Sequence, residues 1–267
     1  MANSLFSSFA PFLRSVSEAE LHAEIASPRR LLIEAGESRG RSFEVAYAPF
    51  DYVNPTARVV LVGLTPGRQQ MTNALLAARK SLLLGHDEER AAKDAKVFAS
   101  FSGPMRSNLI AMLDCVGLHQ TLGLATTSSL WTQRSDLAHF TSVLRYPVFM
   151  NGTNYTGAPV PLAVPLLRRQ VMQWFAEEMR SLPSAVFVPL GPAASDTVAA
   201  AAELAGIDSA QILTGLPHPS GANAERIAFF LGRKAREALS SKVDAEKLIA
   251  ARAILTGKVA SLASKAY

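Results

Sequence analysis

The spacing of apolar and polar residues along the chain predicts a protein in which strands alternate with helices. Four short apolar stretches, rich in β-branched residues, are typical of buried strands. They are RVVLVGL (58–64), AHFTSVL (138–144), AVFVPLG (185–191) and QILTGL (211–216). Helical spacing fills most of the chain around them. Its stretches are 18–36 (two short helices around Pro28), 71–99 (one or two helices), 107–118, 165–182, 192–206, 223–242 and 244–265.

Strands that alternate with helices predict a mainly parallel sheet with both faces covered. We therefore expect an α/β fold, a three-layer α/β/α sandwich around a central, mainly parallel four-stranded sheet. Open sheets of this kind bind ligands outside the carboxyl ends of their strands. The candidate binding loops are then TPGRQQ after Leu64, RYPVFMNGTNYTG after Leu144 and PHPSGANAER after Leu216.

The third of these loops holds a histidine, His218, between Pro217 and Pro219. Each proline ring fixes its own φ and pushes the residue before it toward extended geometry, so the imidazole is aimed in one direction. Two ordinary interpretations stay open. A lone histidine in a loop is more often structural than catalytic. The Pro-Gly sequence of GLTPG (63–67) is also a common turn at the end of a strand. GLTPG also lacks the Gly-Lys-Ser/Thr of a phosphate-binding loop.

Composition narrows the class of protein. The chain has 267 residues, 49% of them hydrophobic, which is enough for one domain with appendages. It contains no apolar run of about 18 residues and begins without the pattern of a secretory signal, so we expect neither a membrane span nor secretion. The lone Cys115 and the scattered histidines predict no disulfide, no metal site and no iron–sulfur cluster. A reducing cytoplasm, no cofactor and a monomer are the corresponding expectations.

Positive charge is concentrated at the end of the chain. Residues 231–267 hold eight Lys and Arg against three Asp and Glu, an excess of five that equals the net charge of +5 of the whole chain. A solvated helix face is the ordinary interpretation. An electrostatic contact surface for a polyanion such as a nucleic acid is the alternative.

Taken together and in order, five motifs resemble the uracil-DNA glycosylase superfamily. They are GLTPG (63–67), FSG (101–103) before a helix, HFTSVLRYPVF (139–149), FVPLGPAA (187–194) and GLPHPSG (215–221). The resemblance covers residues 58–235 and lies closest to the families that carry an iron–sulfur cluster, which Cys115 alone cannot hold. It divides the chain into an N-terminal appendage (1–57), a glycosylase-like domain (58–235) and a basic helical extension (236–267).

The resemblance implies a function for each motif. Such enzymes flip a nucleotide out of DNA and hydrolyse its N-glycosidic bond. His218 would donate a hydrogen bond to the base oxygen, where negative charge grows in the transition state. Phe101 would stack on the base, although a core aromatic is the ordinary interpretation of that residue. The other implied base contacts are Gly63, Leu64, Pro66, Gly67 and Ser142, and the implied DNA contacts are Ser220, Gly221, Asn223, Arg226 and Lys234.

The chain departs from the pattern of the superfamily in two ways. Leu64 and Thr65 stand where an Asp or Asn usually handles the attacking water, so Thr65 could only orient water by hydrogen bonding. Ser142 stands where an Asn reads the pyrimidine edge, which leaves space for a larger, modified base. Replacement contacts could come from the loop that holds Asn151, Asn154 and Tyr155, although an Asn-Gly sequence is more often simply a turn.

The leading hypothesis is a monofunctional DNA glycosylase that removes a deaminated or modified base, in repair or in defence against modified phage DNA. A DNA-binding protein of the same fold with weak or no catalysis is the alternative, suggested by Leu64 and Thr65. A hydrolase of free nucleosides is the third hypothesis.

Overall fold

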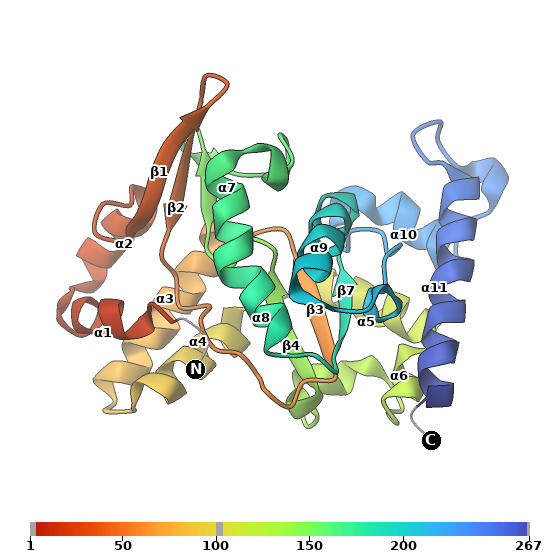
Figure 1. The fold of residues 1–267 in the computed structure, drawn as a ribbon, viewed down its shortest axis with the longest axis horizontal. Helices are drawn as coiled ribbons and strands as arrows, with labels where there is room; N and C mark the ends of the chain where they lie inside the picture. The colour runs from red at the N-terminus through yellow and green to blue at the C-terminus, as the bar shows by residue number, and fades with distance from the viewer. Residues whose placement is uncertain (1–3, 100–103, 266–267) are drawn as a thin grey trace.

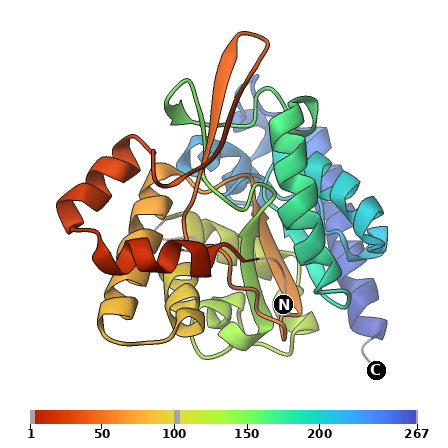
Figure 2. The same cartoon turned by 60° about the vertical axis from the view of Figure 1, so that its left-hand side comes forward.

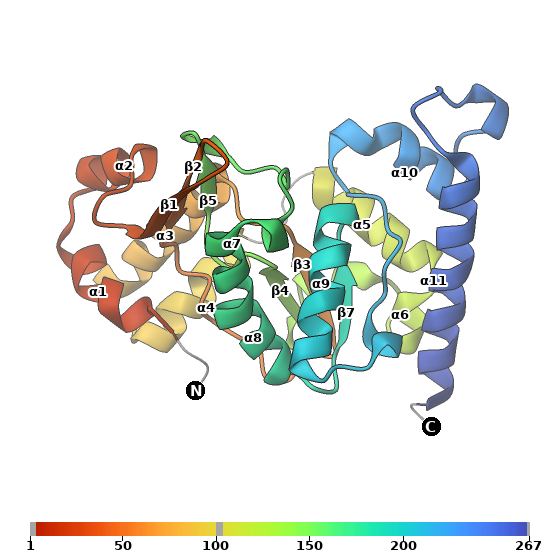
Figure 3. The same cartoon turned by 45° about the horizontal axis from the view of Figure 1, so that its top comes forward.

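The computed structural model describes residues 4–99 and 104–265, and its fold is mixed α/β. Two separate sheets are present among these residues, one parallel and one antiparallel. The parallel sheet lies at the centre. Helices α1–α4 and the antiparallel sheet lie at one end, and helices α10 and α11 lie at the other (Figures 1 and 3).

The parallel sheet has β3 (Val59–Gly63) between β4 (Ala138–Ser142) and β7 (Val186–Pro189). In β3, Val60 and Val62 belong to one hydrophobic cluster with residues of α3, α8 and α9, while Val59 and Leu61 belong to another with residues of α5, α6, α10 and α11. Because adjacent side chains of a strand point to opposite faces, helices cover this sheet on both sides.

Three of the four predicted parallel strands are confirmed, and the fourth is wrong as a full strand. Residue Ile212 forms a single parallel bridge to Phe187, and the backbone N–H of Leu213 donates to the Phe187 carbonyl at 2.8 Å. The ladder stops there because Gly215 has a φ of 117°, far from strand geometry, and Pro217 has no N–H to donate.

The antiparallel sheet was not predicted. Its strands are, in order, β1 (Leu32–Ser38), β2 (Arg41–Ala46), β5 (Val148–Met150) and β6 (Thr153–Asn154). The β1–β2 hairpin projects from the body of the molecule (Figure 2). The predicted second helix after Pro28 is therefore wrong, because this segment pairs with β2 as a strand.

The helices follow much of the predicted pattern, but the helix Phe6–Ser15 was not predicted and two other helices have different bounds. Their bounds are α1 Phe6–Ser15, α2 Glu18–Ala26, α3 Arg68–Leu83, α4 Glu88–Ala99, α5 Pro104–Cys115, α6 Leu118–Thr121, α7 Pro165–Gln170, α8 Ala176–Arg180, α9 Pro192–Ala205, α10 Ala224–Phe230 and α11 Ala245–Lys265. Five residues of π-helix, Val171–Phe175, join α7 to α8. The helix expected from residue 107 begins earlier, at Pro104. The helix expected over 223–242 ends at Phe230, where Gly232 adopts a left-handed φ of 71°.

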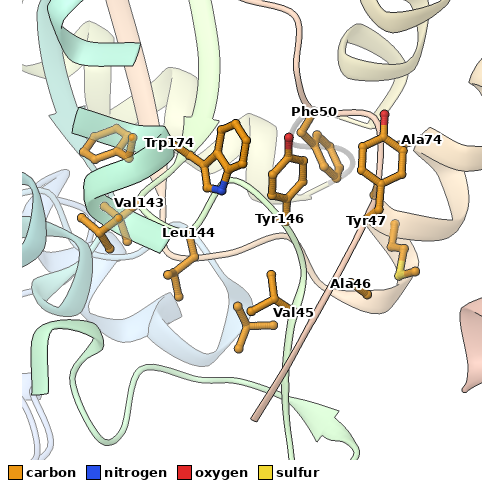
Figure 4. Close-up of a cluster of buried hydrophobic side chains, with 14 of the residues drawn as sticks. Val45, Ala46, Tyr47, Phe50, Ala74, Val143, Leu144, Tyr146 and Trp174 are labelled. Atoms are coloured by element: carbon orange, nitrogen blue, oxygen red, sulfur yellow. The ribbon is translucent and has the colours of Figure 1, made fainter. Parts of the chain in front are cut away.

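The N-terminal segment shares its core with the central part of the chain. Val45, Tyr47 and Phe50 lie among the same buried side chains as Tyr146 and Trp174 (Figure 4). The rings of Tyr47 and Tyr146 are 5.7 Å apart, and both hydroxyls donate to Asp51, at 3.1 and 2.8 Å. Residues before β3 are therefore packed into the body that carries the parallel sheet.

No helix in the described part of the chain is both long and apolar enough to cross a membrane. Across residues 4–99 and 104–265, no three His, Cys, Asp or Glu side chains come together as a metal site would require.

A buried ion network joins β4 to helix α8 and helix α4. Glu178 of α8 accepts hydrogen bonds from Arg145 at 2.9 and 2.5 Å, and its other oxygen lies 2.7 Å from Nε2 of His139. The Lys96 ammonium lies 3.4 Å from the same imidazole nitrogen and donates to the carbonyls of Phe50 and Tyr52. All four ionisable side chains are at most 3% exposed.

The network shifts the pKa values of its ionisable members. Burial alone would raise the pKa of Glu178, but Lys96, Arg145 and His139 together hold it well below its usual range. Burial, with the nearby Lys96 charge, lowers the pKa of His139 to about 4, and burial lowers that of Lys96 to about 8 despite Glu178. At neutral pH, the network therefore holds an ionised carboxylate and a neutral imidazole.

Replacing Glu178 by Gln should lower the free energy of unfolding by about 3–5 kcal/mol, because it leaves Arg145 as a buried and uncompensated charge. Urea denaturation at pH 7 measures the loss. The neighbouring Glu177 is exposed, so Glu177→Gln is the matched control and should change stability by less than about 0.5 kcal/mol. Equal effects of the two variants would contradict the role of the network.

The pH dependence of the free energy of unfolding should reflect the titration of His139. Its folded pKa is depressed to about 4, below the ordinary value of 6.5, so the unfolded chain binds more protons between these values. The free energy of unfolding should therefore fall as the pH drops from 6.5 to 4. His139→Gln, whose amide can donate to Glu178 but does not titrate, should show a shallower fall in urea denaturation over that interval. An identical slope in both proteins would refute the assignment.

Candidate functional site

The carboxyl ends of the parallel strands lie side by side. Gly63, the last residue of β3, is in register with Ser142, the last residue of β4. On the other side, the N–H of Leu190 donates to the Val62 carbonyl at 2.9 Å as the chain leaves β7. Since these three strands are parallel, the segments 64–67, 143–147 and 190–192 all start from one edge of the sheet.

The hydroxyl of Thr65 has structural partners. It donates to the Tyr146 carbonyl at 3.1 Å and accepts the N–H of Val148 at 3.2 Å. These bonds join the turn after β3 to the segment that leads from β4 to β5. The single proton of the hydroxyl is thus in use, and only one lone pair remains for a water molecule.

Asn154 and Gly67 come together, as the predicted base-binding set requires. The Asn154 carbonyl oxygen accepts the N–H of Arg68 at 3.0 Å, and a Cβ added to Gly67 would lie 3.4 Å from the Asn154 amide nitrogen. Gln70 accepts the Gly67 N–H at 3.1 Å. Asn151, in contrast, lies in the turn between β5 and β6 and accepts hydrogen bonds from Ser42 of β2.

A small hollow lies between the turn after β3 and the end of β4. Pro66 and Ser142, both predicted base contacts, line it together. The other lining residues are Phe50, Gln70, Phe140, Thr141 and Arg145. Sequence reasoning missed Gln70, although its place in the first turn of the helix after Pro-Gly was the available signal.

His218 is half-buried and adjoins the turn after β7. A Cβ on Gly191 would lie 3.1 Å from the His218 Cβ, so only glycine, here with a φ of 86°, lets the ring approach this closely. The N–H of Ser220 donates to Nδ1 of His218 at 3.3 Å. Burial lowers the pKa of His218 below its ordinary value. The imidazole is therefore neutral at physiological pH, with its proton on Nε2.

Helix α5 holds the loop that carries this histidine. The Asn108 amide donates to the carbonyl of Pro219 at 3.0 Å. Sequence reasoning missed Asn108, whose role depends on a contact between residues 111 positions apart. Phe101, the predicted stacking residue, lies outside the described residues.

The predicted phosphate contacts are engaged within the protein. Lys234 forms an ion pair with Glu225 at 2.7 Å. Arg226 donates to Lys242 and Asn223, and the Asn223 amide in turn donates to the Ser220 hydroxyl at 3.2 Å. Contact with a phosphate would require these cations to exchange or share their present partners.

The turn after β3 and the turn with His218 both follow parallel segments of the sheet, and His218 is not among the described residues that line the hollow at Pro66. Gly157 lies between the turn after β3 and the start of α9, since an added Cβ there would lie 3.2 Å from Leu64 and 3.1 Å from Ala193. The arrangement supplies a fixed hydrogen-bond donor at His218. Neither Leu64 nor Thr65 supplies a carboxylate general base beside it.

The tautomer of His218 can be measured directly. A long-range ¹H–¹⁵N correlation spectrum at pH 7.5 should show the Nε2–H form, and the pKa of this ring in a pH titration should lie below 6.5, because burial disfavours the cation. His22, which is exposed, provides the internal comparison. A His218 that is protonated at pH 7.5, or carries its proton on Nδ1, would overturn the donor assignment.

Comparison with known proteins identifies a relative that shows the family of this chain. No family model matches the chain, and no solved structure matches it. The chain is 38% identical over 193 residues to the "Uncharacterized protein YoxB" of Bacillus subtilis (strain 168), a match that covers 71% of this chain and 75% of the relative. By that similarity, the chain belongs to the same protein family as YoxB.

Proposed function

We propose that the protein is a DNA glycosylase of the uracil-DNA glycosylase superfamily, which hydrolyses the N-glycosidic bond of a deaminated or modified base. The observation that carries the proposal is the geometry of His218. A half-buried imidazole in a Pro-His-Pro turn accepts the Ser220 N–H at Nδ1, which leaves its proton on Nε2, and this turn follows the segment that bridges to β7.

A neutral hydrogen-bond donor such as His218 suits the hydrolysis of an N-glycosidic bond. As the bond breaks, the sugar becomes cationic and the base leaves as an anion with charge on its oxygen. A donor fixed in place stabilises that charge without reorganisation, and it contributes most when the charge is fully developed. The close packing of His218 on Gly191 and the bond from Asn108 to Pro219 support such a fixed position.

The fold supports the same proposal. In this proposal the parallel sheet forms the centre of a three-layer α/β/α sandwich, and the segment around Ile212 is its fourth strand, reduced to one bridge. The order along the sheet is then β4, β3, β7 and this segment. The turn after β3 and the turn with His218 would face DNA from one edge.

Thr65 affects which substrates are expected. Its hydroxyl donates to Tyr146 and accepts from Val148, so it is poorly placed to orient water and cannot remove a proton. The proposed enzyme therefore depends on stabilising the leaving base. Bases that leave readily, such as deaminated or electron-poor modified bases, are the expected substrates, and Ser142 leaves room for a substituent that an Asn would exclude.

The lack of a general base at Leu64 and Thr65 favours a second candidate function. A protein with this fold and no general base could bind modified DNA without cleaving it. Such binding would depend on contacts to phosphates and would weaken as salt rises. The engagement of Lys234 with Glu225 and of Arg226 with Lys242 indicates that such contacts would be modest in number.

The test is single-turnover cleavage of oligonucleotides that carry uracil, hypoxanthine or modified pyrimidines, in single and double strands, followed by alkali at the abasic site. His218→Ala should slow cleavage by ~10²–10³-fold through loss of the oxyanion donor. His22→Ala, an exposed histidine on α2, is the matched control and should leave the rate unchanged.

Cleavage by His218→Ala at the wild-type rate would refute the donor role. Tight, salt-sensitive binding of a modified oligonucleotide with no abasic product from any substrate would instead select the DNA-binding alternative. Abasic-site mass spectrometry after exposure to differently modified genomic DNAs then identifies the base.

A further inference from the structure

The β1–β2 hairpin ends in a tight, basic turn at the point where it projects farthest from the body of the molecule (Figure 2). Its strands stay paired up to Ser38 and Arg41, so that Arg39 and Gly40 alone form the loop. Arg39 and Arg41 are exposed, and neither side chain forms an ion pair or a hydrogen bond with another residue of the described chain. Two guanidinium groups at the tip are therefore accessible to a partner.

The backbone of this turn is unfavourable for the first residue that it holds. Arg39 has a φ of 51° and Gly40 a φ of 70°. Two positive φ values in a two-residue loop are typical of a type I′ turn, whose first position favours Asn, Asp or Gly. An arginine there costs stability that an asparagine would not. A residue that the turn itself disfavours indicates a role for its side chain outside the turn.

The acidic residues of the hairpin do not cancel the charge at its tip. Glu34 lies near the base of the hairpin and is paired with Arg169 of α7. Glu37 and Glu44 lie on the face of the hairpin opposite to Arg41, because their positions in the register alternate with its own. Positive charge is therefore concentrated at the tip and on one face beside it.

Hydrogen bonds connect the hairpin to the turn after β3. Ser42, next to the tip, donates its N–H and its hydroxyl to Asn151 at 3.0 and 3.2 Å. Asn151 and Gly152 form the turn between β5 and β6, and the Arg68 guanidinium donates to the Gly152 carbonyl at 3.1 Å. Arg68 is the first residue of α3 and directly follows the Pro-Gly turn. The hairpin tip thus lies about three residues, or ~10 Å of strand, beyond a contact with the candidate site.

Phosphate groups match the chemistry of the tip. The planar guanidinium of arginine binds a phosphate with two parallel hydrogen bonds. Residues 37–42, ESRGRS, contain no apolar side chain, so the tip lacks the hydrophobic centre of a typical protein–protein interface. A two-stranded β-ribbon is narrow enough to enter the major groove of DNA, which is bordered by phosphates on both sides. The tip therefore fits a DNA duplex.

We propose that the β1–β2 hairpin is a DNA-binding arm, in which Arg39 and Arg41 bind phosphates of the duplex beside the nucleotide that enters the candidate site. The inference rests on the proposed function, because it takes DNA as the partner. It assigns a role to the N-terminal segment, which lies outside the part of the chain that resembles glycosylases. Because neither arginine would touch the base, both would act on DNA affinity and not on the rate of the chemical step.

Fluorescence anisotropy of a labelled, uracil-containing duplex with the full chain tests the proposal. Arg39→Asn removes the cation but introduces a residue that the type I′ turn favours, so urea denaturation should show a variant at least as stable as the wild type. Arg39→Asn and Arg41→Gln should each weaken DNA binding ~5-fold. Each should also reduce the steepness of log K against log salt by about 1.

Arg58→Gln is the matched control, because Arg58 is exposed and precedes β3 at the opposite, amino-terminal edge of the parallel sheet. This variant should bind DNA as the wild type does. Glu37→Gln, on the same hairpin, should not weaken binding. The inference is overturned if both arginine variants bind as the wild type does, if Arg58→Gln loses as much affinity as they do, or if the wild type does not bind the duplex.

Single-turnover cleavage distinguishes failure of this inference from failure of the proposed function. The arginine variants should need a higher protein concentration to reach half of the maximal rate, and the maximal rate should equal that of the wild type. Cleavage by the wild type, with unchanged DNA affinity in the variants, would refute the arm and leave the glycosylase. Weaker binding in the variants, with no abasic product from any substrate, would refute the glycosylase and leave the arm.

Discussion

The buried carboxylate of Glu178 is the constraint on which the rest of the structure depends. An ionised group that is 1% exposed is tolerated only where compensating charges and hydrogen bonds surround it, and here they come from Arg145, His139 and Lys96. These partners belong to the turn after β4, to β4 itself and to α4. One charge on α8 thereby fixes the positions of three elements around the parallel sheet.

The positions so fixed include those of the candidate site. Arg145 lines the small hollow beside Pro66 and Ser142, and the next residue, Tyr146, provides the carbonyl that Thr65 uses. The turn after β3 is therefore held by bonds that lead back to the ion network. His218 is held differently, by packing on Gly191 and by Asn108 of α5. The two halves of the proposed site thus derive their rigidity from opposite sides of the sheet.

Much of this architecture was predictable from local pattern, and the failures have physical causes. The short apolar runs around Val60 and Val188, rich in β-branched residues, predict buried strands, and the structure confirms them. The strand Leu32–Ser38 was missed because its residues are mostly half-exposed and it includes Glu34 and Glu37, so its strand character comes from pairing with β2. Periodicity cannot distinguish such an edge hairpin from a short helix.

Side-chain roles were less predictable than elements. In AEEMR, Glu177 and Glu178 are adjacent and chemically identical, yet one is exposed and the other is the centre of the ion network. That outcome depends on Arg145 and His139, which lie 33 and 39 positions away. The sequence likewise predicts Lys234 as a DNA contact and Thr65 as a residue that orients water, because their internal partners, Glu225 and Tyr146, are fixed only by the tertiary fold.

A cavity of about 330 Å³, lined by Tyr52, Trp131 and Phe140 among others, lies against β4, which is at the edge of its sheet. Beyond β7, the segment around Ile212 continues the sheet for one bridge, but no described strand pairs with the outer side of β4. An exposed strand edge invites pairing with other chains unless it is covered. Here α4, α5 and the residues before β4 cover it with side chains, including Lys96 and Trp131, instead of a backbone ladder. Side chains of unequal length cannot fill such an edge as evenly as a neighbouring strand would. The uneven fill leaves a space at this edge of the sheet, whereas the edge beside β7 is continued by the bridge to Ile212.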